Sequence, residues 1–379
     1  MYLRKWALRL WMLLLAVFIV VANPAALNAS PSDFNSFGQV NLVSDLPGVA
    51  RFTDPDLVNP WGIAFSPTSP IWIADNGPGL ATIYNGAGVK QGLVVSIPSP
   101  GGGPAAPTGQ VFNPNPANFG GAHFLFSTED GSINAWSAGT TASIAADNSG
   151  GGSIYKGLAL ATSGGSSYLY ATDFHNGAVN VFNTSFTQVT LTGNFTDPAL
   201  PSGFAPFGIQ AFGGKLFVTY ALQDADKEDD VACPGCGFVD VFNTDGTFVQ
   251  RLISMGALNA PWGLAWAPGS FGKFSNDLLV GNFGDGTINA FDPVTGALLG
   301  TIDGSNGMPL VNHGLWGLAF GNGAQGTSTN TLYFTAGIHR EADGLFGAIA
   351  TPEPGSLTLL GTGFVSLIGY GWRRGKRSV

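Results

Sequence analysis

Charged side chains are scarce in this sequence, and basic ones are nearly missing from its middle. Only 10% of the 379 residues are charged, against about a quarter in an average soluble protein. Between Asp33 and Glu353 the chain holds all 24 acidic residues and eight basic ones, a formal charge of −16. A field of this sign repels phosphate backbones and anionic lipids. It excludes nucleic acid as a partner and leaves cations and neutral ligands such as glycans.

Cysteine is also rare, which excludes a disulfide-rich scaffold. The only two are Cys233 and Cys236, in the sequence Cys-Pro-Gly-Cys. In an exported protein such a pair forms either a small loop disulfide or a redox pair, and in a cytosolic one it is half of a metal site. We favour the disulfide, because a redox pair is expected to begin a helix, whereas the acidic neighbours at 224–230 are typical of a solvated loop.

Short catalytic motifs are missing as well. The sequence contains no Gly-x-Ser-x-Gly nucleophile elbow, no His-Glu-x-x-His and no phosphate-binding Gly-x-x-x-x-Gly-Lys. The acidic residues 224–230 lack the spacing of a dedicated calcium loop. Calcium binding there stays open as the single cofactor hypothesis.

The two ends of the chain have the composition of export signals. Residues 1–29 combine three basic residues, an apolar run and small residues, as a secretory signal peptide does. At the other end, residues 351–379 contain Pro352-Glu353-Pro354, an uncharged stretch at 355–372, and a basic cluster that begins with Arg373 and Arg374. Eighteen uncharged residues can span a bilayer as a helix, and the basic cluster should stay in the cytoplasm. A buried C-terminal helix is the alternative, but it gives the arginines no role.

This tail resembles the PEP-CTERM sorting signals of exopolysaccharide-producing Gram-negative bacteria. Three elements in fixed order carry the resemblance, namely Pro352-Glu353-Pro354, the apolar span and the arginine-rich end. It implies an exported protein that is anchored in the membrane until an exosortase-type enzyme processes it. The expected location is the cell envelope or the extracellular space.

A short segment built around a glycine recurs six times in the middle of the chain. The clearest copies are Asn59-Pro-Trp-Gly-Ile-Ala-Phe, Ala260-Pro-Trp-Gly-Leu-Ala-Trp and Gly314-Leu-Trp-Gly-Leu-Ala-Phe. The six glycines, spaced by 47 to 55 residues, are Gly62, Gly109, Gly157, Gly208, Gly263 and Gly317. Further β-rich runs separated by turns follow each copy, which gives four strands per repeat of about 50 residues.

This spacing predicts an all-β fold, a six-bladed β-propeller over residues 34–350. The last repeat ends near Ile349, before a fourth strand of its own, whereas residues 37–43 form a strand without a repeat. We therefore expect the N-terminal strand to complete blade six and close the ring, which removes the open sheet edges. A solenoid or a pair of β-sandwiches is the alternative. Neither explains why the last repeat lacks one strand while the start of the chain has one strand to spare.

The repeat region resembles an uncharacterised family of PEP-CTERM-associated propellers and, more distantly, NHL-type propellers. The segments beginning at Asn59 and Ala260 carry this resemblance. It implies a fold and a location, and it assigns no catalytic residue.

One face of such a propeller collects the loops that enter each first strand and those that join second to third strands. Aromatic, acidic, amide and imidazole side chains from separate blades meet there. The candidates for this ligand rim are Trp61, Asp75, Asn76, Asp173, His175, Trp262, Asn282, Asp285, His313, Trp316, His339 and Glu341. Glu129, Asp130 and Phe207 are expected on the same face. Together they can bind a cation or a polar ligand, with the tryptophans as stacking surfaces. Equally, Asp and Asn before glycine are ordinary turn residues, and repeated aromatics can wedge blades together.

Two functions fit these observations. The first is a surface-sorted binding module of the envelope or exopolysaccharide matrix, whose partners are a polysaccharide or another envelope protein. The second is a metal-assisted hydrolase or lyase at the channel mouth, using His175, His313 and His339. A propeller can host either function. The missing catalytic motifs favour the binding module.

Overall fold

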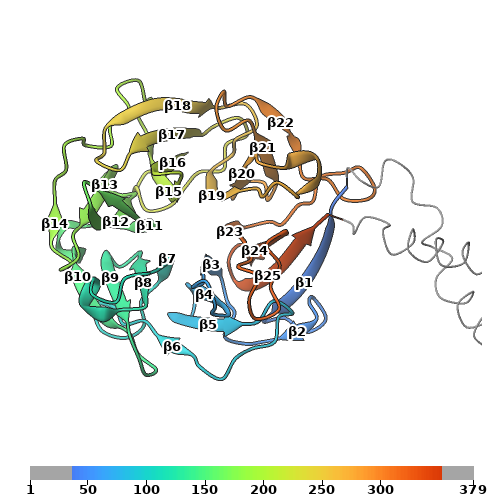
Figure 1. The fold of residues 1–379 in the computed structure, drawn as a ribbon, viewed down its shortest axis with the longest axis horizontal. Coiled ribbons are helices and arrows are strands. Elements are labelled where there is room, and N and C mark those ends of the chain that lie inside the picture. The colour runs from blue at the N-terminus through green and yellow to red at the C-terminus, as the bar shows by residue number, and fades with distance from the viewer. Residues whose placement is uncertain (1–35, 352–379) are drawn as a thin grey trace, which may run out of the picture. The chain divides into compact units, whose positions relative to one another are not determined.

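The computed structural model describes residues 36–351, which fold as a six-bladed β-propeller (Figure 1). Residues 37–351 form one compact unit. None of the helices in the described part of the chain is long and apolar enough to cross a membrane. The predicted signal peptide at 1–29, the Pro352-Glu353-Pro354 motif and the predicted span at 355–372 lie outside the described residues.

Blades 1 to 3 follow one another along the chain, each with its first strand innermost (Figure 1). Blade 1 consists of β3 (Pro60–Ala64), β4 (Ile71–Asp75), β5 (Leu80–Tyr84) and β6 (Val95–Ser96). Blade 2 consists of β7 (Pro107–Phe112), β8 (Phe124–Thr128), β9 (Ser132–Trp136) and β10 (Ser143–Asp147). Blade 3 consists of β11 (Tyr155–Ser163), β12 (Ser166–Asp173), β13 (Ala178–Phe182) and β14 (Gln188–Val189). The short 3₁₀ turns η3 (Phe119–Gly121) and η4 (Ser149–Gly151) lie in the connections.

Blades 4 and 5 repeat this plan, and blade 6 departs from it. Blade 4 consists of β15 (Phe204–Phe212), β16 (Lys215–Leu222), β17 (Phe238–Asn243) and β18 (Phe248–Ser254). Blade 5 consists of β19 (Pro261–Trp266), β20 (Leu278–Asn282), β21 (Ile288–Phe291) and β22 (Leu298–Thr301), with η5 (Gly272–Phe274) in a loop. Blade 6 takes β23 (Leu315–Phe320), β24 (Thr331–Ile338) and β25 (Asp343–Ala350) from the end of the chain, and β1 (Gly38–Ser44) and β2 (Phe52–Thr53) from its start.

The N-terminal strand closes the ring, as the sequence predicts. Strand β1 pairs antiparallel with β25, in a register that runs from Gly38 opposite Ala350 to Ser44 opposite Leu345. Just before β1, the Phe37 ring stacks on Phe274 of blade 5, with ring centroids 5.9 Å apart. The first and last strands are therefore held together both by a backbone ladder and by the apolar core between blades 5 and 6.

The six repeat glycines have a steric reason. Each lies in an innermost strand, where a Cβ would collide with the backbone of the next blade or, at Gly157, lie only 3.0 Å from it. At Gly208 the added carbon would lie 2.1 Å from the carbonyl oxygen of Trp262, and at Gly317 it would lie 2.5 Å from that of Trp61. The contact from Gly317 links blade 6 back to blade 1, so the glycines mark close approaches all the way around the axis.

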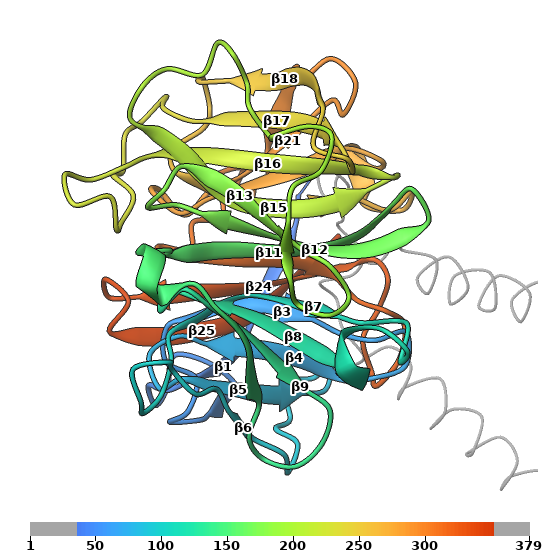
Figure 2. The same ribbon diagram turned by 90° about the vertical axis from the view of Figure 1, so that its left-hand side faces the viewer.

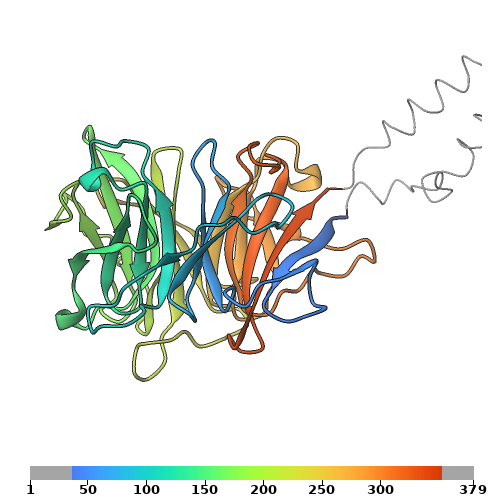
Figure 3. The same ribbon diagram turned by 90° about the horizontal axis from the view of Figure 1, so that it is seen from below.

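Apolar side chains fill the spaces between neighbouring blades. The clusters pair blade 1 with 2, 2 with 3, 3 with 4, 4 with 5, 5 with 6 and 6 with 1. All of β4 is buried, because both faces of a blade are covered by its neighbours. Figures 2 and 3 show the strands of each blade running from one face of the ring to the other. The loops on those two faces, and the channel between them, are what remains for function.

Candidate functional site

Three tryptophans close the central channel beneath one of its mouths. Trp61, Trp262 and Trp316 each stand immediately before a repeat glycine, and they cluster with Phe207 across four blades. The Trp61 and Trp316 rings are stacked with centroids 3.4 Å apart, and the three side chains are 1 to 9% exposed. The predicted rim tryptophans therefore lie below the rim as a floor, where they offer little free stacking surface.

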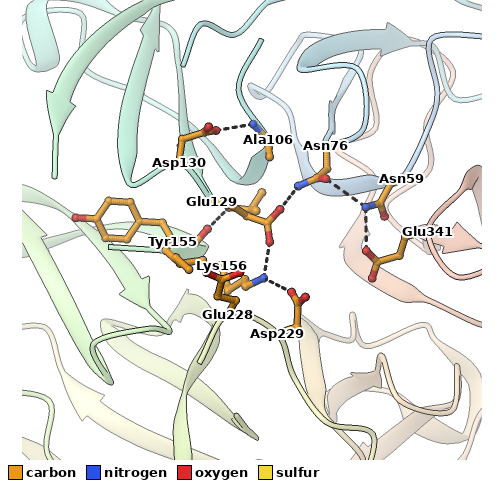
Figure 4. Close-up of polar contacts among 12 residues, drawn as sticks. Asn59, Asn76, Ala106, Glu129, Asp130, Tyr155, Lys156, Glu228, Asp229 and Glu341 are labelled. Atoms are coloured by element: carbon orange, nitrogen blue, oxygen red, sulfur yellow. Dashed lines mark hydrogen bonds and ion pairs between the residues drawn. The ribbon is translucent and has the colours of Figure 1, made fainter. Parts of the chain in front are cut away.

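Lys156 takes the place of the aromatic residue in blade 3. It stands before Gly157 in β11, it is only 2% exposed, and its Nζ lies 5.3 Å from the centre of the Trp61 ring. The ammonium donates to Glu129 of blade 2 and, at 3.0 Å, to Asp229 of blade 4 (Figure 4). Burial opposes the charge on Lys156, but the two carboxylates outweigh burial and raise its pKa. This lysine is therefore a fixed cation on the channel axis.

Two asparagines extend the network to blades 1 and 6. Asn76 Nδ2 donates to Glu129 at 2.8 Å, and Asn59 Nδ2 donates to Asn76 Oδ1 and to Glu341 Oε2, both at 3.2 Å (Figure 4). Asn59 Oδ1 accepts from the Trp316 indole at 3.2 Å. We call Asn59, Asn76, Glu129, Lys156, Asp229 and Glu341 the polar mouth. It joins donors and acceptors from five blades directly above the tryptophan floor.

Two residues of the polar mouth, Asn59 and Glu341, have left-handed backbone conformations. Asn59 has φ of 46° although it precedes a proline, and Glu341 ends a run of three residues at positive φ that begins at His339. Left-handed backbone costs energy in residues other than glycine, and it tends to persist at functional sites. At Asn59 the conformation belongs to the repeat, since Ala260 at the matching position of blade 5 has φ of 44°. The Asn59 amide in this conformation donates to Glu341.

Two buried carboxyl groups titrate near neutrality, Glu341 of the polar mouth and Asp230, which follows Asp229 in the acidic loop. Burial raises the pKa of Glu341 to about 7, and repulsion from Glu129 adds to the shift. Burial also raises the pKa of Asp230 to about 7, against the attraction of Lys156. Asp230 Oδ2 is buried without a hydrogen-bond partner. Both groups thus carry only a partial negative charge at neutral pH.

Several predicted rim residues instead hold hairpins together under the surface. Asp75 accepts from Thr82 Oγ1 at 2.7 Å, and Asp173 accepts from Asn180 at 3.1 Å. In blade 5, Asn282 donates to Thr287 Oγ1 at 3.2 Å. Asp75, Asp173 and Asn282 are at most 1% exposed. Asp285 caps the same hairpin in blade 5 through the Thr287 backbone at 3.0 Å. These four residues behave as turn residues.

The histidines separate into two places on this face. His313 and His339 line a cavity of about 500 Å³ together with Phe283, Arg340 and Glu341. His339 Nδ1 lies 2.8 Å from Asp343 Oδ2. His175 lies elsewhere, beside Gly152 of blade 3, and its Nδ1 is buried without a partner. The structure thus brings two of the three predicted histidines close to Glu341.

The acidic loop of blade 4 folds back over the axis. It joins β16 to β17, carries Asp229 to Lys156 and contains a disulfide between Cys233 and Cys236. Cys233 N donates to Asn259 Oδ1 at 2.8 Å, which ties the loop to blade 5. Among residues 36–351, no group of three or more His, Cys, Asp or Glu side chains is arranged to hold a metal ion.

Sequence reasoning missed Asn59, Lys156 and Asp229 as site residues. A signal for Lys156 was present, because a lysine stands where four of the other repeats carry Trp or Phe before glycine. For Asp229 the sequence offered none, since its loop has the composition of any solvated acidic loop.

The comparisons with known proteins agree with this architecture. Residues 350–377 match the PEP-CTERM protein-sorting motif, a motif that implies export, association with the envelope and processing by an exosortase-type enzyme. The uncharacterized protein R648 of Acanthamoeba polyphaga mimivirus is 32% identical over 330 residues, which cover 82% of this chain and 80% of the viral protein. The chain belongs to the same family as R648.

Solved structures similar to this one share its fold at low identity. The soluble aldose sugar dehydrogenase of Escherichia coli matches with a TM-score of 0.55 at 12% identity, over 84% of this chain and all of that one. A catalytically inactive virginiamycin B lyase of Staphylococcus aureus matches with a TM-score of 0.51 at 14% identity, over 83% of this chain and 99% of that one. At these identities the likeness shows the propeller fold alone.

Proposed function

We propose that this protein is an exported propeller that acts as a binding module of the cell envelope or its exopolysaccharide matrix, with the ligand seated at the polar mouth. The observation that carries the proposal is the network around Lys156. Its amides, ammonium and carboxylates come from five blades and already pair with one another. A bound ligand can replace these hydrogen bonds with its own. Because all of these groups are already paired, none of them stands free as a nucleophile, which favours binding over catalysis.

The chemistry of the mouth favours a neutral or amine-bearing sugar. Sugar hydroxyls both donate and accept, and at the mouth they can reach the carboxylate of Asp229, which is 75% exposed. The propeller as a whole is acidic, so a polymer of uronic acids is repelled. The sorting motif supports an extracellular ligand of this class, because it directs the chain out of the cytoplasm.

Retention on immobilised polysaccharides tests the proposal. The panel contains neutral, amino-sugar and uronic-acid polymers, and we expect retention by the first two. Asp229→Asn should weaken retention on the amino-sugar polymer several-fold. Asp292→Asn should leave it unchanged, because Asp292 lies in the turn between β21 and β22 on the opposite face. Lack of retention on every neutral and amino-sugar polymer would contradict the proposal.

A lyase or hydrolase is the second candidate, and one observation favours it. The cavity lined by His313, His339 and Glu341 places a carboxyl group with a pKa of about 7 beside two imidazoles, as general acid–base chemistry requires. A metal-assisted mechanism finds no trio of ligands within residues 36–351. Elemental analysis, together with turnover of candidate polysaccharides by His339→Ala, separates this candidate from the binding module. Turnover that the substitution abolishes would establish the enzyme.

A further inference from the structure

The channel has a second mouth, at the end opposite Lys156, and its chemistry differs from that of the first. The inner strands of all six blades end there around a cavity of about 500 Å³. Its aromatic residues are Phe65, Phe112, Phe212, Trp266 and Phe320. Trp266 is 39% exposed, and its ring lies 5.8 Å from that of Phe212. None of the lining residues is charged. A cavity of this size is typical of small-molecule sites.

A buried amide lies at the base of this cavity. Gln110 of β7 is 6% exposed, and neither its Oε1 nor its Nε2 has a hydrogen-bond partner among residues 36–351. The same side chain lines a smaller cavity of about 40 Å³, deeper in the channel among the repeat glycines. Leaving a buried donor or acceptor unpaired costs about 1–3 kcal/mol. The Gln110 amide is therefore left to a water molecule or a ligand that reaches it through one of these two cavities.

We propose that the second mouth binds a flat, uncharged ring compound that presents a neighbouring N–H and C=O, as a lactam or a nucleobase edge does. A primary amide offers one acceptor and one donor side by side, and such an edge pairs with both at once. The aromatic walls suit the faces of a ring. The absence of charged lining residues disfavours an ionic ligand, which would lose its hydration without a counter-charge.

A pair of matched probes tests this proposal on the full chain. Quinolin-2-one carries the required N–H and C=O, and its N-methyl derivative has the same ring and carbonyl but no N–H. Isothermal titration should show binding of quinolin-2-one and at least about tenfold weaker binding of the N-methyl derivative, since one hydrogen bond to a buried amide is lost. No binding of quinolin-2-one, or equal affinities for the two probes, would overturn the proposal.

Substitutions test whether Gln110 causes the preference for quinolin-2-one over its N-methyl derivative. Gln110→Met keeps the length of the side chain and removes the amide, so the two probes should then bind within about twofold of each other. The control Gln250→Met changes an exposed glutamine of β18 and should preserve the tenfold difference. Discrimination that survives Gln110→Met would assign the binding elsewhere and contradict the proposal.

The stability of the free protein provides an independent readout. If no part of the chain satisfies the Gln110 amide, Gln110→Met should unfold at the same temperature as the unsubstituted protein or higher. A clear loss of stability would mean that a fixed water molecule already satisfies the amide. In that case the cavity is not a free ligand site.

Discussion

Lys156 is the residue on which the polar mouth depends. It is buried above Trp61 and compensates the charges of Glu129 and Asp229. Replacing it with methionine keeps most of the apolar packing but leaves those carboxylates to repel each other and Glu341. Removing one partner of a buried ion pair is costly because the other charge remains.

We expect Lys156→Met to lower the free energy of unfolding by about 2 kcal/mol, less than for a fully buried pair because Asp229 is largely exposed. Urea denaturation measures the loss. The control Lys227→Met changes an exposed lysine of the acidic loop and should cost almost nothing. If both variants unfold at the same urea concentration, the ion pairs of Lys156 contribute nothing to stability.

Glu341 should make the stability of the protein depend on pH. Burial raises its pKa from 4.5 to about 7, so between these values the folded chain binds more protons than the unfolded chain. Stability is then greatest at the acidic end of this window and falls as the pH rises through 7.

Glu341→Gln removes this contribution. We expect the variant to gain stability relative to the unsubstituted protein as the pH rises from 4.5 to 8, by roughly 3 kcal/mol, because the pKa of Glu341 rises from 4.5 to about 7 and each pKa unit is worth about 1.4 kcal/mol. Asp230 and Asp240, whose pKa values burial also raises to about 7, keep a residual slope in both proteins. Parallel melting-temperature curves over this range would contradict the assignment.

At the scale of single strands, the innermost strand of each blade explains both the repeat and the channel. Its glycine allows the next blade to approach, the preceding residue in blades 1, 4, 5 and 6 builds the channel floor, and the strand ends at the second mouth. Gly208→Ala should therefore push β15 away from β19. We expect a loss of about 2 kcal/mol in urea denaturation.

Gly150→Ala is the matched control for this prediction. Gly150 lies in η4, and a Cβ there meets nothing within 4 Å. Equal stabilities of the two alanine variants would show that the close approach between inner strands is unimportant.

The strands were predictable from sequence where one physical constraint repeats. A glycine within an apolar run marks every inner strand. Outer strands were predictable from alternating apolar residues, and the run at 238–242, for example, lies within β17. The site was less predictable, because its contacts join loops far apart in the chain. Lys156 and Asp229 are 73 residues apart, and no periodic pattern records that contact. Conversely, Asp75 and Asp173 are typical site residues by type, but the hairpins need them as buried acceptors.

At the scale of the whole molecule, ring closure by β1 protects the last blade. Without β1, the edge of β25 and the apolar face around Phe37 would be open to solvent. We expect deletion of residues 36–44 to produce oligomers or aggregates in size-exclusion chromatography, because an unpaired edge recruits other strands. Val40→Lys changes an exposed side chain of the same strand and should leave the protein monomeric. A monomeric deletion variant would argue against closure by β1.

The two mouths give the molecule two chemically distinct ends, one polar with a buried lysine and one aromatic without charge. We propose that the extracellular ligand binds at the polar mouth and not at the aromatic one. Hydrogen exchange measured by mass spectrometry, with and without the polysaccharide that the protein retains best, tests it most directly. We predict slower exchange in the loop between β16 and β17, which carries Asp229, and in the loop between β24 and β25, which carries Glu341. Protection confined to the opposite face, or none at all, would contradict this assignment.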